Sequence, residues 1–302
     1  MTVVALPNIL GDLNFYASNI LWVNLIYLCA LVATCIPFAK LISKYGVKKS
    51  TMISLIALLI SLLLTVFAVN QYMLLLSRLI QGLTCASLTS GIYIMIVAGL
   101  SESDVGSGLG IVGSAGYLGM LMASSFMGFM IYLASWRIAF LFLVPFIIIQ
   151  LILLKNISFE ENIDEKAFDI KGALLYGIIM ALTTLGFESI DENGLILILI
   201  SLIIFAVFLK YENNIKNPIY NFKLFKDINY VIGNYAALAT NFSVTIAVTA
   251  LSFHLHYLLD IDEHIAGLIL IISPVMMVIT APYAGKLSNK IDARLISVFS
   301  LL

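Results

Sequence analysis

The chain is built from apolar runs that are each long enough to cross a membrane as a helix. A span needs about 20 residues, and nine runs reach that length, near residues 20–41, 50–69, 73–100, 105–133, 137–154, 170–187, 195–209, 231–259 and 265–284. A tenth run begins near residue 295, and MTVVALP at the start indicates the end of another. Backbone amides in hydrocarbon must pair within their own segment, so runs of this length are expected to be helices. The sequence therefore predicts an all-α, polytopic membrane helix bundle.

The composition supports this class and excludes others. Of the 302 residues, 62% are apolar and 11% are charged, and the mean hydropathy is +1.07. A soluble domain carries roughly 25% charged residues. Cys29, Cys35 and Cys85 lie inside apolar runs without a CxxC pattern, so neither disulfides nor a zinc site is expected. Because no nucleophile–base pair or metal-ligand cluster stands out, we expect no enzymatic activity, cofactor, metal or nucleic-acid partner.

Basic residues predict the orientation of the helices. If the segment before residue 20 lies outside the cell, the loops after the first, third, fifth, seventh and ninth runs are cytoplasmic. Those loops and their helix ends hold all but two of the 16 basic residues. The exceptions are Arg137, at an outer helix end, and Arg78, inside a run. This bias follows the positive-inside rule and predicts a multi-pass protein of the cytoplasmic membrane.

Two of the basic loops resemble each other. AKLISKYGVKK starts at Ala39, GKLSNKIDAR starts at Gly285, and each follows an apolar run with a proline near its inner end, Pro37 or Pro282. Parallel internal repeats occur in one large class of secondary transporters. The match favours such a repeat over the chance similarity of two short basic loops.

Five further stretches narrow the class. They are ALPNI with WVNLIYLCA near the start, RLIQGLTCA at 78–86, SWRIAFLFLVPF at 135–146, DIKGALL at 169–175 and KYENNIKNPIYNFKLF at 210–225. Together they resemble the major facilitator superfamily, in particular its fourteen-helix drug:proton antiporter branch (EmrB/QacA type). The last two stretches resemble the edges of the two extra helices that distinguish this branch from twelve-helix relatives. The resemblance implies the major facilitator fold.

The same resemblance implies a domain organisation. The nine runs fall on helices 2 to 10 of that branch, so most of helix 1 and everything from helix 12 onward are expected to lie outside the chain, which then looks truncated at both ends. Residues 1–155 correspond to the N-terminal half, residues 156–229 to the two extra helices, and residues 230–302 to the start of the C-terminal half.

The chain also departs from the pattern of that branch. The loop between helices 2 and 3 normally carries a glycine first and an aspartate four residues on, and here these positions are Ala39 and Ser43. The helix 5 motif, normally Gly-Pro followed by Gly-Gly, reads ASSFMG from Ala123 to Gly128. The acidic residue of helix 1 would precede Met1. These departures weigh against proton-coupled export more than against the fold.

Arg78 is the only charged residue between Tyr72 and Leu100. A central arginine raises the free energy of membrane insertion by roughly 2.5–3.5 kcal/mol. Each of the Leu and Ile residues around it lowers that free energy by about 0.3–0.6 kcal/mol. Arg78 either extends to the outer surface or faces the bundle interior and couples to a protonatable acid. Gln81 and Gly82, in register with the helix 4 motif, favour the second reading. Since Asp12 and Glu188 are expected to be ordinary interfacial residues, the coupling acid is predicted to be missing from this chain.

Three further groups are candidate sites. Small residues of the 105–133 run are expected to serve helix packing and gating: Gly113, Gly116, Gly119, Ser124 and Gly128. GLGIVG in this run fits GxGxxG, but no strand precedes it, so a dinucleotide site is excluded. A loop motif is expected to set topology and, by resemblance, to form a cytoplasmic latch: Leu41, Lys44, Gly46, Lys48 and Lys49. Asn234 and Asn241 are expected either to line a cavity or to bond across helices.

Three functions stay open from the sequence. The first is proton-coupled export of amphipathic, often cationic, drugs or other small organic compounds by alternating access. The second is a remnant without transport activity, or part of a split transporter whose missing helices come from a second chain. The third is a carrier for one specific metabolite, which the altered helix 5 motif favours. The expected partners are the lipid bilayer, protons and a small organic substrate.

Overall fold

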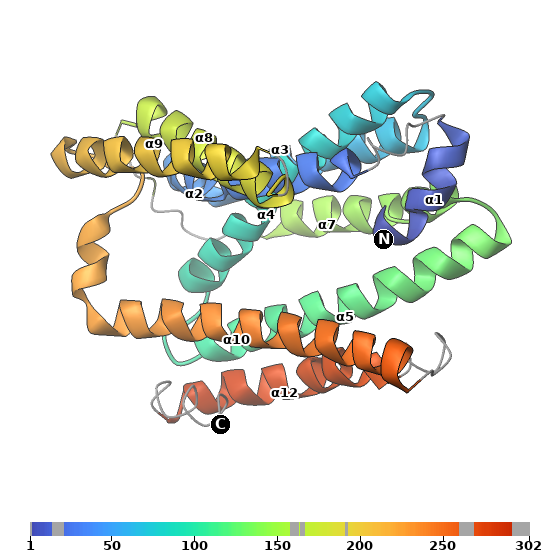
Figure 1. Cartoon of the computed structure of the whole chain (residues 1–302). Helices are drawn as coiled ribbons and strands as arrows, with labels where there is room; N and C mark the ends of the chain where they lie inside the picture. Colours follow the sequence, from blue (N-terminus) through green and yellow to red (C-terminus); the bar gives the residue numbers. More distant parts are fainter. Residues whose placement is uncertain are drawn as a thin grey trace. The chain divides into compact units, whose positions relative to one another are not determined.

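The computed structural model describes residues 2–13, 21–157, 163, 167–190, 193–259 and 269–291. Its helices (Figure 1) are α1 (Thr2–Asp12), α2 (Trp22–Tyr45), α3 (Val47–Val66), α4 (Gln71–Gly99), α5 (Val105–Leu133), α6 (Trp136–Leu141), α7 (Val144–Asn156), α8 (Ile170–Glu188), α9 (Gly194–Asn214), α10 (Ile228–Phe253) and α12 (Ile272–Ser288). A 3-10 turn, η2 (Phe222–Lys226), precedes α10, and a π-helical turn, η3 (His254–Leu258), follows it. Within these residues, 8 helical stretches are long and apolar enough to cross a membrane. The predicted all-α membrane fold is confirmed.

Several helix boundaries differ from the prediction by a few residues, and two of the differences have a local cause. The run expected to end near residue 41 continues as α2 to Tyr45, because its lysines and aliphatic residues are good helix formers outside the bilayer as well as in it. Gly46, with a φ of 91°, is the only residue between α2 and α3. The run expected at 137–154 is broken between α6 and α7, since Pro145 has no N–H to donate to the carbonyl of Leu141.

The chain forms two compact units. Unit 1 consists of residues 1–99 and 126–221, and unit 2 of residues 100–125 and 222–302. In unit 1, α4 packs against both α2 and α3, α8 packs against α9, and α2 packs against α8. The helices α8 and α9 therefore lie in the same unit as α2 to α4.

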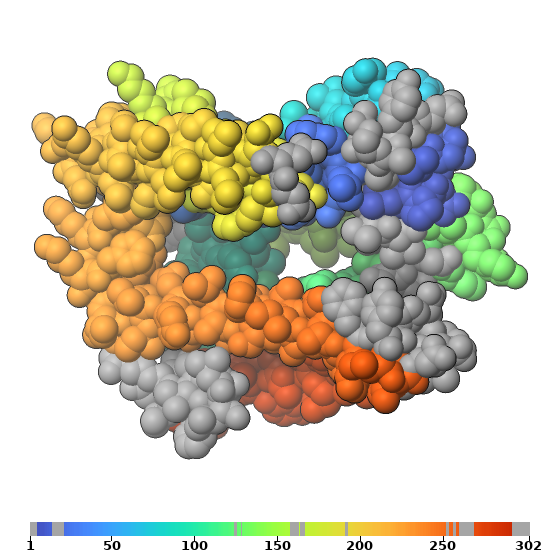
Figure 2. Space-filling model, viewed as in Figure 1, coloured from blue at the N-terminus to red at the C-terminus, as the bar shows by residue number. Residues whose placement is uncertain are grey.

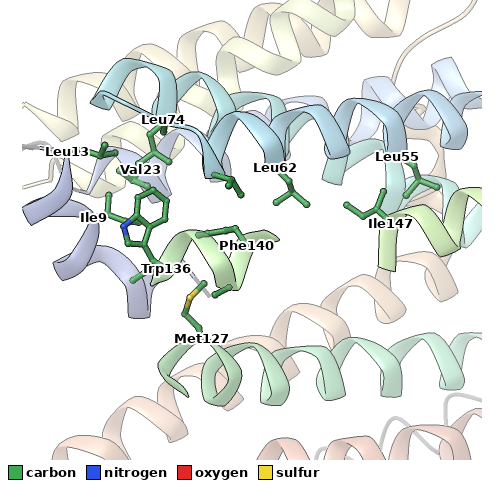
Figure 3. Close-up of a cluster of buried hydrophobic side chains, with 14 of the residues drawn as sticks. Ile9, Leu13, Val23, Leu55, Leu62, Leu74, Met127, Trp136, Phe140 and Ile147 are labelled. Carbon is green, nitrogen blue, oxygen red and sulfur yellow. The ribbon is translucent and has the colours of Figure 1, made fainter. Parts of the chain in front are cut away.

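The apolar core of unit 1 gathers around Trp136, which is only 1% exposed. Figure 3 shows its indole ring in one cluster with Ile9, Val23 and Phe140. Burying an aromatic side chain of this size stabilises the folded state by roughly 1.5–3 kcal/mol or more. The cluster joins α1, α2, α6 and the end of α5, so the start of the chain is tied to the motif at 135–146.

The outer surface of unit 1 is apolar as well. Figure 2 shows the side chains of α9, coloured yellow to gold, lying open on one face of the unit. The large exposed apolar residues of this helix are Leu195, Ile196, Leu199, Ile200, Leu202, Ile203, Phe205 and Val207. A continuous apolar surface of this kind is a liability in water, whereas in a bilayer it faces lipid.

In unit 2, the first part of α5 packs against α12 through glycines. A Cβ added at Gly110 would come within 2.6 Å of the carbonyl oxygen of Ala281 and 3.1 Å of the Cα of Gly285. Two hydrogen bonds reinforce the contact, from the Ser114 hydroxyl to the Val278 carbonyl (2.6 Å) and from the Asn289 amide to the Ser107 hydroxyl (3.0 Å). Small residues allow backbones to approach this closely in membranes.

Candidate functional site

Arg78 lies inside unit 1, on the face of α4 that packs against α2. Its side chain is only 6% exposed. The Nε–H donates to the backbone carbonyl of Val23 (3.0 Å), and Nη1 donates to Oε1 of Gln81 (2.5 Å). The guanidinium carbon stands 4.5 Å from the ring centroid of Tyr27, close enough for a cation–π interaction. The arginine is therefore held by protein groups and is not directed into lipid.

Gln81 links Arg78 to α3. It is 3% exposed and lies three residues after Arg78, on the same face of α4. Its Nε2 donates to the hydroxyl of Thr65 (2.9 Å), and this hydroxyl also pairs with that of Ser77 (2.8 Å). This chain of bonds fixes the Oε1 of Gln81 toward Arg78, because its Nε2 is committed to Thr65.

Gly82 sets the distance between α2 and α4. A Cβ at this position would overlap the carbonyl oxygen of Tyr27 and would come within 2.7 Å of the Cβ of Ala30. With any larger residue α2 would have to move away, and the ring of Tyr27 would leave the guanidinium of Arg78. Arg78, Gln81 and Gly82 therefore all contribute to the contact region between α4 and α2.

A cavity of about 480 Å³ opens beside this arginine. Its lining consists of Asn24, Tyr27, Leu58, Leu62, Arg78, Gln81, Cys85, Phe140, Leu143, Phe146, Ile147 and Gln150. The volume falls within the range of about 300–1,000 Å³ that is common for small-molecule sites. Within the described residues the lining contains no carboxylate, so the positive charge of Arg78 is met by neutral acceptors and an aromatic ring.

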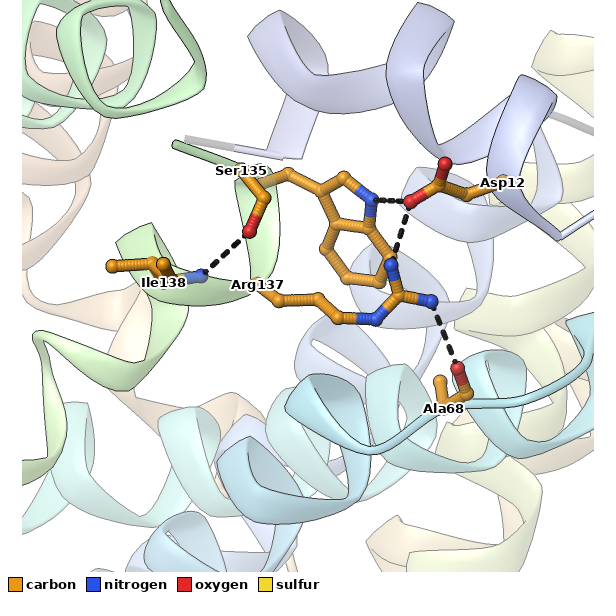
Figure 4. Close-up of polar contacts among 6 residues, drawn as sticks. Asp12, Ala68, Ser135, Arg137 and Ile138 are labelled. Carbon is orange, nitrogen blue, oxygen red and sulfur yellow. Dashed lines mark hydrogen bonds and ion pairs between the residues drawn. The ribbon is translucent and has the colours of Figure 1, made fainter. Parts of the chain in front are cut away.

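A second arginine of unit 1 lies at a helix end, with a counter-ion (Figure 4). Arg137 pairs with Asp12 at 2.6 Å and also donates to the backbone carbonyl of Ala68 (3.1 Å). The indole N–H of Trp136 donates to the same carboxylate oxygen (2.8 Å). The hydrogen bond from Trp136, and then the bond and charge of Arg137, lower the pKa of Asp12 below its ordinary value. This cluster joins α1, α6 and the α3–α4 turn.

The residues of the loop motif occupy different surroundings. Gly46 takes the left-handed backbone conformation that glycine adopts without strain. The ammonium group of Lys48 donates to the carbonyls of Lys155 (3.0 Å) and Ile157, at the end of α7 where the helix dipole is negative. Lys44 stands 5.5 Å over the ring of Tyr45, Lys49 is exposed, and Leu41 is half-buried.

The glycines of α5 are not equivalent. Gly106 and Gly110 make the closest approaches to α12, whereas Gly113 meets only the Cβ of Ala281 at 3.9 Å. A Cβ added at Gly116 or Gly119 would have no described atom within 4 Å. Ser124 and Gly128 belong to α5, but their packing lies outside what the structure describes.

Asn234 and Asn241 are exposed on α10 and bond within their own helix. Their amides donate to the carbonyls of Tyr230 (2.8 Å) and Ala237 (2.9 Å). Whether they line a cavity stays a prediction.

Sequence reasoning missed several residues that the structure brings to the Arg78 site. Val23 and Tyr27 come from α2 and lie in WVNLIYLCA, a stretch that carries the resemblance, whereas Thr65 comes from α3 and its local sequence gives no such signal. It also missed Asp169 and Glu212, two buried acids at the ends of α8 and α9. Asp169 lies in DIKGALL and Glu212 in KYENNIKNPIYNFKLF, so the resemblance of these two stretches was the signal that could have identified them.

These observations define a multi-pass helical membrane protein with a buried charge beside an open cavity. A comparison with protein families matches residues 1–211 to the Major Facilitator Superfamily. The chain belongs to this superfamily.

Three relatives illustrate the range of the family. The riboflavin transporter RibZ of Clostridioides difficile is 27% identical over 293 residues, which cover 96% of this chain and 64% of RibZ. The uncharacterized MFS-type transporter YhcA of Bacillus subtilis is 24% identical over 310 residues, 99% of this chain and 58% of YhcA. The quinolone resistance protein NorB of Staphylococcus aureus (strain MRSA252) is 29% identical over 210 residues, 67% of this chain and 44% of NorB. The chain thus spans less than two thirds of the length of each of these relatives.

Proposed function

We propose that this chain works in proton-coupled export of amphipathic organic compounds across the cytoplasmic membrane, as a member of the fourteen-helix drug:proton antiporter branch. The observation that carries the proposal is Arg78, a buried charge without a described counter-ion beside an aromatic-lined cavity of about 480 Å³. An intramembrane charge of this kind is costly and is usually retained for function. In the branch register, α8 and α9 are the two extra helices, residues 1–155 belong to the N-terminal half and residues 230–302 begin the C-terminal half.

The role of Arg78 is electrostatic. Its guanidinium is always charged, so protonation of an acid that approaches the cavity changes how strongly that acid is attracted. A transporter with two conformations shifts toward the state in which this attraction is greater. The acid comes from outside the described lining of the cavity. Gln81 and Gly82 position Arg78 and keep α2 close.

The cavity suits flat aromatic compounds without a permanent positive charge. Tyr27, Phe140 and Phe146 offer ring faces and edges, and Asn24 and Gln150 offer hydrogen bonds. Arg78 repels a cation at this depth. The names of two relatives agree with this class, because riboflavin and quinolones both contain flat fused rings. The cationic compounds expected from the family resemblance fit the cavity less well.

The second candidate is a carrier for one metabolite. It is favoured by the likeness to RibZ, which extends over 96% of the chain. The altered ASSFMG stretch of α5 also favours it. In either case, a second chain that supplies further helices is a partner to be tested, since the chain spans 64% of the length of RibZ.

Inverted membrane vesicles that contain the protein expressed from its complete natural gene test the proposal. An imposed pH gradient, acidic inside, is expected to drive quinolone and riboflavin into the vesicles, and a protonophore is expected to abolish this uptake. A permanently cationic dye is expected to enter poorly. Uptake that ignores the protonophore contradicts proton coupling, and uptake of riboflavin alone favours the single-metabolite carrier.

A further inference from the structure

Two acidic side chains are buried together where α8 begins and α9 ends, on the side predicted to be cytoplasmic. Asp169 immediately precedes α8 and is 9% exposed, and Glu212 lies in the last turn of α9 and is 3% exposed. Each has one oxygen with a clear partner. The Tyr211 hydroxyl donates to Oδ1 of Asp169 (2.8 Å), and the backbone N–H of Tyr220 donates to Oε2 of Glu212 (3.0 Å).

The other oxygen of each acid is buried and unpartnered among the described residues. These atoms are Oδ2 of Asp169 and Oε1 of Glu212. Both are aimed at the same place, because a Cβ added at Gly172 would overlap both of them. The two oxygens therefore lie beside the same space, which the missing side chain of Gly172 leaves open.

Two bare carboxylates are unfavourable in this arrangement. Like charges at short range disfavour simultaneous ionisation, and a buried oxygen without a hydrogen bond is costly. One proton removes both problems, since a protonated Oε1 of Glu212 donates to Oδ2 of Asp169. Glu212 is the residue that holds the proton, because it is the more buried of the two and Asp169 already accepts from Tyr211.

We propose that Asp169 and Glu212 form a proton-binding site, in which a single proton is shared between Oε1 of Glu212 and Oδ2 of Asp169. No transport activity is assumed. When the proton leaves, the pair carries two negative charges and the O–H···O bond is lost.

The proton has a route to the solvent. Asp169 lines a cavity of about 240 Å³, together with residues of α2 and of the segment after α9. Water in this cavity accepts the proton when it is released. Lys40 and Lys44 from α2 and Lys216 from the segment after α9 line this cavity with Asp169. The titratable hydroxyl of Tyr211 lies beside Asp169 as well.

Release of the proton strengthens the attraction between the acids and these lysines. Because Glu212 also holds the backbone of Tyr220, the change in charge acts on the segment that follows α9 and on its contact with α2. The site therefore makes the docking of the α8–α9 pair on α2 sensitive to cytoplasmic pH.

Infrared spectroscopy of the purified full chain in lipid nanodiscs tests the site, because a protonated carboxyl group has a C=O stretch that a carboxylate lacks. At neutral pH the wild-type protein is expected to show this band and to lose it at alkaline pH. The Glu212→Gln variant is expected to lack the band at neutral pH. Glu188→Gln, an exposed acid at the other end of α8, is the matched control and is expected to keep it.

Thermal unfolding gives a second readout. The folded wild-type protein binds the extra proton, so its stability is expected to fall as the pH rises through the release of that proton. Glu212→Gln keeps a donor toward Asp169, and its melting temperature is expected to stay constant over the same range.

The proposal is overturned if wild-type protein lacks the band at neutral pH, or if Glu212→Gln retains it. The proposal is also overturned, in favour of a cation site, if sodium ions stabilise the wild-type protein at constant pH and do not stabilise Glu212→Gln. If Glu212→Gln fails to fold, Asp169→Asn replaces it, because its amide donates to an ionised Glu212 and the band is expected to disappear in the same way.

Discussion

The two arginines of unit 1 are held in opposite ways. Arg137 lies at a helix end with a carboxylate at 2.6 Å, and its side chain is 32% exposed. Arg78 is 6% exposed and is bound by a backbone carbonyl, an amide and an aromatic ring. An exposed ion pair is worth little and is already satisfied. The buried guanidinium has no described counter-ion, and under the proposed function its charge responds to an acid that approaches.

The largest effect is expected from removing each arginine in turn. Under the proposed function, Arg78→Ala is expected to lower pH-gradient-driven efflux by about tenfold or more, which corresponds to roughly 1.4 kcal/mol in the barrier. Arg137→Ala is expected to change it by less than about twofold, because its partner Asp12 stays hydrated. Efflux per inserted molecule in inverted vesicles measures both. Equal losses of efflux in the two variants would show that the buried and the exposed arginine do not differ in function.

The next effect concerns the helix contact that shapes the buried site. Gly82→Ala is expected to destabilise the protein by about 1–3 kcal/mol, because the new methyl group overlaps the Tyr27 carbonyl and the helices must separate. Gly99→Ala is the matched control on the same helix, since a Cβ there has no described atom within 4 Å. Unfolding by detergent titration measures the difference. Two variants of equal stability would show that α2 does not depend on Gly82.

The part of the Arg78 site that lies on one helix could be predicted from the sequence. Arg78, Gln81 and Gly82 share a face because helical neighbours recur three and four residues apart. The partners Val23, Tyr27 and Thr65 could not, since they come from other helices and apolar runs carry no local sign of which faces meet. The apolar runs could be predicted as helices for the same reason that their packing could not, because hydropathy reports on the lipid around a run and not on its neighbours.

Two details that hydropathy does not report have physical reasons. The break between α6 and α7 depends on the single missing N–H of Pro145, which hydropathy ignores. Glu212 is far from Asp169 in sequence, and only the antiparallel course of α8 and α9 brings their ends together. The glycines of α5 could be recognised as a packing surface, but Gly106 and Gly110 could be chosen over Gly116 only once α12 was in place.

A smaller effect is expected from the hydrogen bonds that hold Arg78. Thr65→Val keeps the shape of the side chain and removes the acceptor of Gln81, so Gln81 is no longer fixed toward the guanidinium. We expect a loss of roughly 0.6–1.7 kcal/mol in unfolding free energy, the range for hydrogen bonds between membrane helices. Thr183→Val is the matched control, because this threonine bonds across α8 and α9, away from Arg78. Under the proposed function only Thr65→Val is expected to lower efflux as well, and an unchanged rate would separate Gln81 from the mechanism.

The smallest effect is expected at the exposed pair, and it has a defined sign with pH. Its neighbours hold the pKa of Asp12 below the ordinary carboxyl value of about 3.9. The folded state therefore binds fewer protons than the unfolded state near that pH, and the stabilisation is present above it and lost as the pH falls further. Because the Asp12 side chain is 47% exposed, solvent reduces the contribution to roughly 0.2–1 kcal/mol. Asp12→Asn is expected to lose this amount at neutral pH and to converge with the wild-type protein in acid. If the stability deficit of Asp12→Asn stayed constant down to acidic pH, Asp12 would act through its shape beside Trp136 and not through its charge. The two arginines would then differ in burial alone.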